Sequence, residues 1–238
     1  MQSLENKHVV IIGATSGIGL AAARQAAALG AKVWGASRSP ERVDAASKEV
    51  PDATFTALDI HDTEAMTRLF ESVGSIDHLV GCATGADRTM APFLEQTEAQ
   101  FQEAFGKFWG YCNLVRHGAP FLTAEASITL VSGTPARKCN PGMSAISCVG
   151  NAVEGLTRAL ALEMAPRRVN VVAPGIIDTG MFDRFGDKKA EALANMGKNV
   201  PLGRVGQPDE VAAAILAAMT NTYMTGATLD VDGGTLLP

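Results

Sequence analysis

The sequence predicts a single α/β domain built on a doubly wound parallel sheet, and two observations support this. Short apolar runs alternate along the chain with longer segments that have helical spacing. Such alternation gives parallel strands with right-handed crossovers and helices on both faces. The chain also has 238 residues, 47% hydrophobic and 19% charged, which is enough for one sizeable core. With no linker or repeat to divide it, we expect one domain over 1–238.

Seven apolar runs are predicted to form the strands, and five segments between them have helical spacing. The predicted strands are 9–12, 33–36, 55–58, 76–80, 127–131, 168–172 and 228–231. The predicted helices are 20–25, 64–72, 95–121, 149–164 and 208–219. In sheets of this kind the ligand binds beyond the carboxyl ends of the strands. The residues that follow those ends are therefore the candidates for a site.

A glycine-rich turn joins the first predicted strand to the first predicted helix. Gly13 can take a backbone conformation that other residues avoid, while Gly17 and Gly19 let a phosphate and the strand approach closely. Thr15 and Ser16 add hydroxyl donors, and the free N–H groups that open the helix can hold an anion. The same glycines also suit an ordinary tight turn, but the strand before and the helix after supply the context that the motif requires. We therefore expect a Rossmann-type dinucleotide site.

Composition excludes some partners. The net charge of −5 argues against general nucleic-acid affinity, and no apolar run approaches the ~20 residues that span a bilayer. The four cysteines form no CxxC pair, and the start shows no cationic and then apolar leader. We expect a cytoplasmic protein whose partner is a small-molecule substrate, not a nucleic acid or a membrane.

These motifs resemble those of the short-chain dehydrogenase/reductase family over nearly the whole chain. The turn at 13–19 matches the cofactor loop of that family, although Ile12 stands where Thr is usual. Residues 81–84 occupy the place of an Asn-Asn-Ala-Gly turn and keep only the alanine, while residues 230–234 match the usual ending. The resemblance implies a nicotinamide cofactor held by Gly13, Thr15, Ser16, Gly17, Ile18, Gly19, Asp59, Ile60, Cys82, Ala83, Thr84, Pro174, Gly175, Ile177 and Thr179.

Charge after the second predicted strand indicates which nicotinamide cofactor is used. An NAD site places a carboxylate there to accept the ribose hydroxyls, whereas a 2′-phosphate calls for a cation. This chain has Ser37 and Arg38, and no acid before Glu41. Arginine meets a phosphate with two parallel charged hydrogen bonds. We therefore expect NADP(H), the alternative being that Arg38 merely points into solvent.

The usual catalytic pair of the family does not appear in the sequence. In that family a tyrosine exchanges a proton with the substrate oxygen, and a lysine one helical turn later lowers the tyrosine pKa. Aligned on the helix at 149–164, these positions fall on Ile146 and Gly150. The two tyrosines, Tyr111 and Tyr223, lie elsewhere. We expect a divergent member that lacks the Tyr-x-x-x-Lys pair.

Two other residues are candidates for catalysis. Ser132 lies at or next to the position of the family's serine, although an ungapped count favours Gly133, and a local backbone cap is the alternative. Lys107 occupies the position of the family's asparagine. It could place a cation near the nicotinamide ribose, so it is a candidate both for catalysis and for cofactor binding. Alternatively its stem packs on Trp109 while the ammonium reaches water.

Several further polar residues have weaker claims to a chemical role. They are Arg137, Lys138, Cys139, Asn140, Ser144 and Cys148. The four histidines lie on different predicted elements, so no metal is expected.

The first hypothesis is an NADP(H)-dependent oxidoreductase that acts on a small carbonyl or alcohol substrate through a non-standard catalytic site. The alternative is a catalytically inactive NADP(H)-binding sensor or scaffold, and no residue set argues specifically for elimination or isomerisation. The resemblance further implies a substrate lid at about 180–200 and dimer surfaces at 95–121 and 149–164. A homodimer or homotetramer is expected, unless the small residues of those helices pack on the sheet instead.

Overall fold

One parallel sheet of seven strands organises the protein. The computed structural model describes residues 3–84 and 90–238. The strand order is β3-β2-β1-β4-β5-β6-β7, and every neighbouring pair is parallel. The strands are β1 (His8–Ile12), β2 (Lys32–Ser37), β3 (Ala53–Ala57), β4 (Ile76–Gly81), β5 (Leu122–Val131), β6 (Arg168–Pro174) and β7 (Thr228–Val231). The predicted doubly wound Rossmann-type fold is thus confirmed, and its strand order reverses between β1 and β4.

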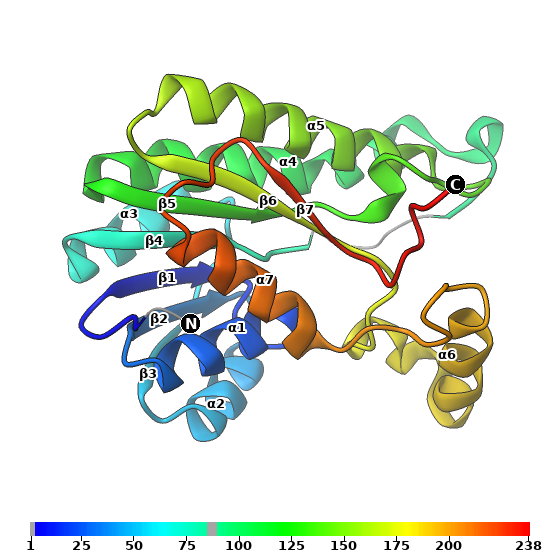
Figure 1. Ribbon diagram of the computed structural model, residues 1–238, viewed down its shortest axis with the longest axis horizontal. Coiled ribbons are helices and arrows are strands. Elements are labelled where there is room, and N and C mark those ends of the chain that lie inside the picture. The colour runs from blue at the N-terminus through cyan, green and yellow to red at the C-terminus, as the bar shows by residue number, and fades with distance from the viewer. Residues whose placement is uncertain (1–2, 85–89) are drawn as a thin grey trace.

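Helices cover both faces of the sheet (Figure 1). On one face lie α3 (Thr63–Val73), α4 (Glu98–Gly118) and α5 (Ser144–Glu163), and on the other α1 (Gly17–Ala28), α2 (Pro40–Glu49) and α7 (Pro208–Thr220). Each layer encloses its own apolar cluster, the first around Phe70 and Tyr111 and the second around Ile11 and Ile215. The sheet is therefore buried on both sides, which explains why its central strands read as continuous apolar runs.

The segment after β6 leaves these layers. It forms a 3-10 stretch, η4 (Gly180–Lys188), followed by α6 (Lys189–Gly197), and projects beyond the sheet (Figure 1). The other short 3-10 helices are η1 (Phe93–Glu95), η2 (Ala119–Phe121) and η3 (Thr134–Ala136). Of these, η3 follows β5 and packs on α5, so it shapes the site described below.

Several elements differ from the sequence-based expectation, among them α2, α5 and α6, the last of which was not predicted as a helix. Helix α2 was not predicted, although Ser39 accepts a hydrogen bond from the Arg42 N–H as its N-cap and Pro40 opens the helix, both of which are start signals. Helix α5 begins at Ser144, before the expected start at 149, and has no side-chain cap to mark that start. The earlier start places Ile146 inside the helix.

Candidate active site

The glycine turn after β1 lies directly against the turn after β4. Gly13 has a φ of 91°, and a Cβ added to it would stand 2.5 Å from the Ala83 backbone nitrogen. Its N–H donates to the Ala36 carbonyl at 2.7 Å, and the Cys82 N–H donates to the Ile12 carbonyl at 2.8 Å. Only glycine fits such an approach, so the predicted residues of these two turns do lie together.

The start of α1 is equally close-packed, and it faces a distant segment. A Cβ on Gly19 would stand 2.0 Å from the Gly13 carbonyl oxygen, which is an impossible contact. Gly17 has a φ of 53°, and its added Cβ would stand 3.1 Å from Cγ2 of Thr179. The fold therefore brings the glycine turn and the segment after β6 to one place at the carboxyl ends of the strands.

The beginning of α1 has the features of an anion site. Ser16 precedes the helix without a side-chain cap bond, and the first turn holds no acidic residue. Thr15 Oγ1 is buried and has no hydrogen-bond partner in the described part of the chain. A buried hydroxyl without a partner is costly unless a ligand satisfies it. The helix dipole and the N–H groups add to the same preference, so these residues fit a dinucleotide phosphate.

The residues predicted to bind the adenosine end lie after β2 and β3. Arg38 is exposed and makes no hydrogen bond or ion pair within residues 3–84 and 90–238. Glu41, the nearest acid in sequence, is occupied by the Ser39 hydroxyl, which donates to it at 2.7 Å. Asp59 accepts the His61 N–H at 2.9 Å, and Ile60 packs where a Cβ on Gly110 would stand.

The segment from Pro174 to Thr179 is held in place by its backbone. The Gly175 N–H donates to Val231 at 3.0 Å, and the Asp178 N–H donates to Gly206 at 2.9 Å. Ile177 is buried, while the Thr179 hydroxyl accepts the Met181 N–H at 3.4 Å and begins η4. These backbone bonds, together with the ion pair between Asp178 and Lys189 at 3.0 Å, hold Thr179 beside the glycine turn.

Lys107 is buried at the strand tips, contrary to the alternative in which its ammonium reaches water. It is 9% exposed; its Nζ donates to the Ser132 carbonyl at 3.4 Å and lies 5.6 Å from the Tyr111 ring centre. Burial raises the pKa of the neighbouring Cys82 thiol to about 12, even though the charge of Lys107 opposes the rise. Cys82 is therefore a poor nucleophile, and Lys107 supplies positive charge beside Ser132.

Neither tyrosine offers an accessible phenol at this edge of the sheet. Tyr111 is fully buried and donates to the Val131 carbonyl at 3.2 Å, whereas Tyr223 is fully exposed beyond α7. Ile146 is half-buried on α5. A Cβ on Gly150 would stand 2.9 Å from the Cβ of Ala136, because η3 packs against that turn of α5.

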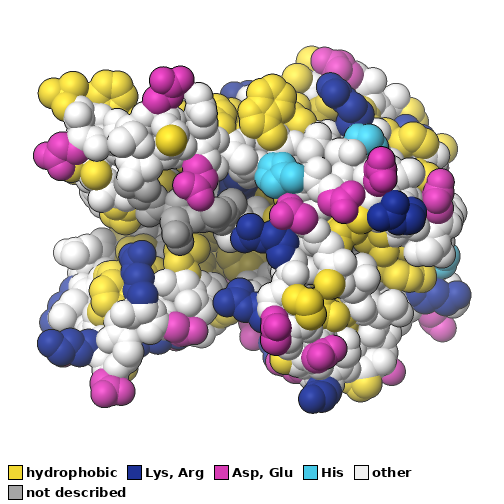
Figure 2. All heavy atoms as spheres, turned by 180° about the vertical axis from the view of Figure 1, so that it is seen from behind, with side chains coloured by type: hydrophobic (Ala, Val, Ile, Leu, Met, Phe, Trp, Pro, Cys, Tyr) yellow, Lys and Arg dark blue, Asp and Glu magenta, His cyan; other side chains and the backbone are white. Residues whose placement is uncertain are grey.

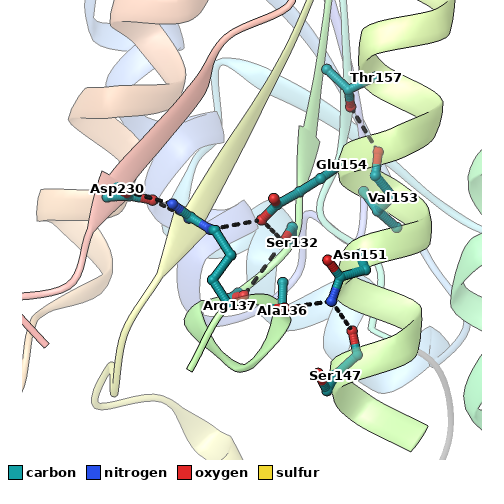
Figure 3. A network of polar contacts seen from close by, with 10 residues as sticks. Ser132, Ala136, Arg137, Ser147, Asn151, Val153, Glu154, Thr157 and Asp230 are labelled. Carbon is teal, nitrogen blue, oxygen red and sulfur yellow. Dashed lines mark hydrogen bonds and ion pairs between the residues drawn. The ribbon is translucent and has the colours of Figure 1, made fainter. Parts of the chain in front are cut away.

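A buried carboxylate that the sequence reasoning did not single out lies one turn further along α5. Glu154 is 5% exposed and accepts a hydrogen bond from Ser132 Oγ at 3.1 Å (Figure 3). Arg137 contacts the same Glu154 oxygen through Nε at 3.4 Å and also pairs with Asp230 on β7. Ser132 is thus not a simple backbone cap. Its position four residues after Gly150 on the same helix, between Val153 and Gly155, was the available signal.

The remaining predicted polar residues have structural contacts or lie at the surface. Lys138 donates to the Thr235 carbonyl at 2.7 Å, and Ser144 accepts from Gln96 Nε2 at 3.1 Å. Cys139 and Cys148 are exposed and unpaired. Within the described residues, no group of three or more His, Cys, Asp and Glu side chains is arranged to hold a metal ion.

Seen from behind, the surface is hollowed between two projecting parts of the molecule, and several Lys and Arg side chains stand along the hollow (Figure 2). Positive charge beside a recess favours an anionic ligand, despite the overall negative charge of the chain.

Across residues 3–84 and 90–238, none of the helices has the length and apolar character that crossing a bilayer requires.

Comparison with known proteins identifies the family. A family model described as enoyl-(acyl carrier protein) reductase matches residues 13–235. The short-chain dehydrogenase/reductase ATR9 of Stachybotrys chlorohalonatus is 35% identical over 254 residues, and the match covers 100% of both chains. The chain belongs to the short-chain dehydrogenase/reductase family. It is therefore an oxidoreductase of the NAD(P)-dependent short-chain type.

Two solved structures of the short-chain dehydrogenase/reductase family are especially similar. The MalC reductase/Diels-Alderase of Malbranchea aurantiaca superposes with a TM-score of 0.91 at 31% identity, covering 99% of this chain and 98% of that one. An NADPH-bound short-chain oxidoreductase of Pseudomonas aeruginosa, which contains an atypical catalytic centre, has a TM-score of 0.90 at 29% identity and covers 98% and 99%.

The packing of η3 against α5 gives a stability prediction. Gly150→Ala is expected to destabilise the protein by about 1–2 kcal/mol, because overpacking costs ~1–3 kcal/mol and helix propensity returns at most ~1 kcal/mol. Gly106→Ala on α4 is the matched control: its Cβ would meet only His61 Nε2, at 3.7 Å, so a gain is expected. Urea unfolding measures both variants. Equal stability would mean that η3 moves aside freely.

Proposed function

We propose that this short-chain dehydrogenase/reductase is an NADP(H)-dependent oxidoreductase that acts on a small carbonyl or alcohol substrate. The observation that carries the proposal is the meeting of the glycine turn, which holds Thr15, with the start of α1 and Thr179. Among the described residues the buried Thr15 hydroxyl has no hydrogen-bond partner. One end of that arrangement suits a phosphate, and Thr179 suits the nicotinamide carboxamide. The NADPH-bound Pseudomonas relative supports the same cofactor class.

The preference for NADP(H) rests on Arg38. Its guanidinium is exposed beside the β2 end, and Glu41 is occupied by Ser39. A 2′-phosphate placed there would meet this cation, and guanidinium binds phosphate with two parallel hydrogen bonds.

The catalytic site is proposed to be non-standard. Ile146 and Gly150 stand at the family's tyrosine and lysine positions, and the contact between Gly150 and Ala136 leaves no room for a longer side chain without moving η3. The Pseudomonas relative with an atypical catalytic centre supports the idea that the fold tolerates such changes.

The bound nicotinamide would carry the hydride, and the residues of this chain would orient the substrate and handle its charge. Ser132 directly follows β5, at the carboxyl end of the sheet, where we place the substrate oxygen. Lys107 places positive charge behind Ser132, where it stabilises an oxygen that gains negative charge. These two residues are the proposed catalytic set.

The test of this function is consumption of NADPH with diketones or quinones, for which protonation is least demanding. Lys107→Met, which keeps the apolar stem, is expected to lower the rate about 10²-fold by removing the buried charge. NADPH affinity, followed by fluorescence, separates this effect from lost cofactor binding. An unchanged rate would remove Lys107 from the mechanism.

The alternative, an inactive NADP(H)-binding sensor or scaffold, is favoured by the same Ile146 and Gly150. It predicts tight NADPH binding without consumption against a broad panel of carbonyls and alcohols. The name of the MalC relative joins reduction to a Diels-Alder reaction, which supports keeping non-redox chemistry in that panel.

We further propose that the protein forms a homo-oligomer, that residues 180–200 form a substrate lid and that the protein is cytoplasmic. Exposed Trp109 on α4 and Leu162 on α5 support a homodimer or homotetramer through these helices, which light scattering would measure. The projection of η4 and α6 beyond the sheet supports a substrate lid at 180–200. A cytoplasmic location rests on composition alone.

A further inference from the structure

Glu154 is an unusual residue to find inside this domain. It lies on the same face of α5 as Ile146 and Gly150, at successive steps of four residues. With only 5% of its surface exposed, its carboxylate has lost nearly all of its water. Burial of a charged carboxylate costs several kcal/mol unless it is paired and hydrogen-bonded. Its retention therefore calls for an explanation.

The surroundings of Glu154 compensate its charge. Arg137 Nε lies 3.4 Å from Glu154 Oε1, and the rest of the guanidinium binds both carboxylate oxygens of Asp230 (Figure 3). The hydrogen bond to Asp230, followed in effect by the charge of Glu154, raises the pKa of Arg137 against the effect of its burial. The network therefore pairs the buried carboxylate of Glu154 with a guanidinium that is itself held by Asp230.

The hydrogen bond to Glu154 sets the direction of the Ser132 hydroxyl. A carboxylate only accepts hydrogen bonds, so at 3.1 Å the Ser132 hydroxyl donates its hydrogen to Glu154. The Ser132 oxygen then presents lone pairs to a ligand. A substrate atom that meets Ser132 must bring its own hydrogen, which a hydroxyl does and a carbonyl does not.

Lys107 narrows the class of ligand further. Its Nζ lies 3.4 Å from the Ser132 carbonyl oxygen, on the side of α4. A second cation there repels a positively charged substrate and stabilises an oxygen that becomes negative. Among residues 3–84 and 90–238, the charged groups around this point are Lys107, Arg137 and Glu154, with Asp230 and Asp232 acting on Arg137. Together they favour a neutral alcohol over a protonated imine.

We propose that Glu154 is a positioning residue that accepts a proton through Ser132, so that the site is built to oxidise an alcohol. This inference rests on the proposed NADP(H) function. The carbinol C–H bond breaks and its hydride, with both electrons, passes to NADP⁺. The substrate O–H proton moves to Ser132 Oγ while the Ser132 hydrogen moves to Glu154, and the O–H electrons become the second bond of the ketone. The proton returns to solvent through Ser132 after the ketone leaves.

The test compares Glu154→Gln with wild type, using NADP⁺ with cyclohexanol and 1-phenylethanol and NADPH with the matching ketones. Glutamine keeps the shape but cannot take a proton, so kcat for oxidation is expected to fall about 10²–10⁴-fold while KM and the NADPH Kd stay within about threefold. Glu154→Asp, which keeps a proton acceptor, should recover part of the loss. Thr157→Val is the matched control, because it deletes a buried hydroxyl of the same helix that donates to the Val153 carbonyl at 2.9 Å. It should leave kcat unchanged.

A readout without turnover tests the same inference. The infrared difference between wild type and Glu154→Gln, in free protein, is expected to show carboxylate bands. A protonated carboxyl band would overturn the proposal, as would an unchanged kcat in Glu154→Gln. The proposal would also be overturned if the wild-type protein bound NADPH, or reduced the ketones, but oxidised neither alcohol. Failure of wild type to bind NADPH would instead overturn the proposed function. If Glu154→Gln does not fold, Glu154→Asp serves as the infrared reference, and an Asp variant with full kcat and a protonated band contradicts the inference.

Discussion

Gly19→Ala is expected to abolish NADPH binding and to destabilise the protein by about 3 kcal/mol or more, a large value for one methyl group. The added Cβ would stand 2.0 Å from the Gly13 carbonyl oxygen and 2.8 Å from its carbon, both backbone atoms. They cannot rotate away as a side chain would. Relief requires the start of α1 to move from β1, which displaces the N–H groups proposed to hold the phosphate.

Two measurements separate the parts of that effect. Urea unfolding reports the stability loss, and NADPH fluorescence reports binding at a temperature where the variant is still folded. Gly106→Ala, a methyl added where a helix has room, is expected to bind NADPH normally. Normal binding by Gly19→Ala would show that the phosphate does not depend on the start of α1.

Arg38→Glu is expected to weaken NADPH binding about 10²–10³-fold, equivalent to roughly 3–4 kcal/mol, while NADH binding stays the same or improves. The substitution removes two charge-assisted hydrogen bonds and places a carboxylate beside the 2′-phosphate, where a ribose hydroxyl is the better partner. Fluorescence titration with both reduced cofactors gives the ratio directly.

The control for Arg38→Glu is Arg68→Glu on α3. It makes the same change in net charge at a residue that pairs with the exposed Glu64, 3.8 Å away. Exposed pairs of this kind contribute about 0–1 kcal/mol, so both affinities should remain unchanged. If Arg38→Glu keeps the NADPH preference, Arg38 points into solvent and the cofactor is selected elsewhere.

The fold was predictable because the local signals agreed with each other. Apolar runs buried on both faces mark β1 and β4, and glycine marks the turn after β1, where the backbone demands it. The strand at 228–231 was placed with its observed bounds. The start of β5 was missed because residues 123–125 are not continuously apolar and lie partly or fully exposed.

The site was only partly predictable, because its contacts join residues distant in sequence. The motifs identified Gly17 and Thr179 separately, and their 3.1 Å approach is a property of the folded chain. Glu154 was missed because its partners, Arg137 and Ser132, lie far from it in sequence and meet it only in the folded chain. The burial of Lys107 likewise depends on β5, so sequence left both of its interpretations open.

The central claim is that a hydride-carrying dinucleotide binds at these strand ends with no tyrosine to protonate the substrate. A crystal structure with NADPH tests it most directly. We predict pyrophosphate at the start of α1, the 2′-phosphate on Arg38, the carboxamide at Thr179, and Ser132 with Ile146 opposite the reactive carbon. A tyrosine hydroxyl within hydrogen-bond reach of that carbon's substrate, or a cofactor bound anywhere else, would contradict the account.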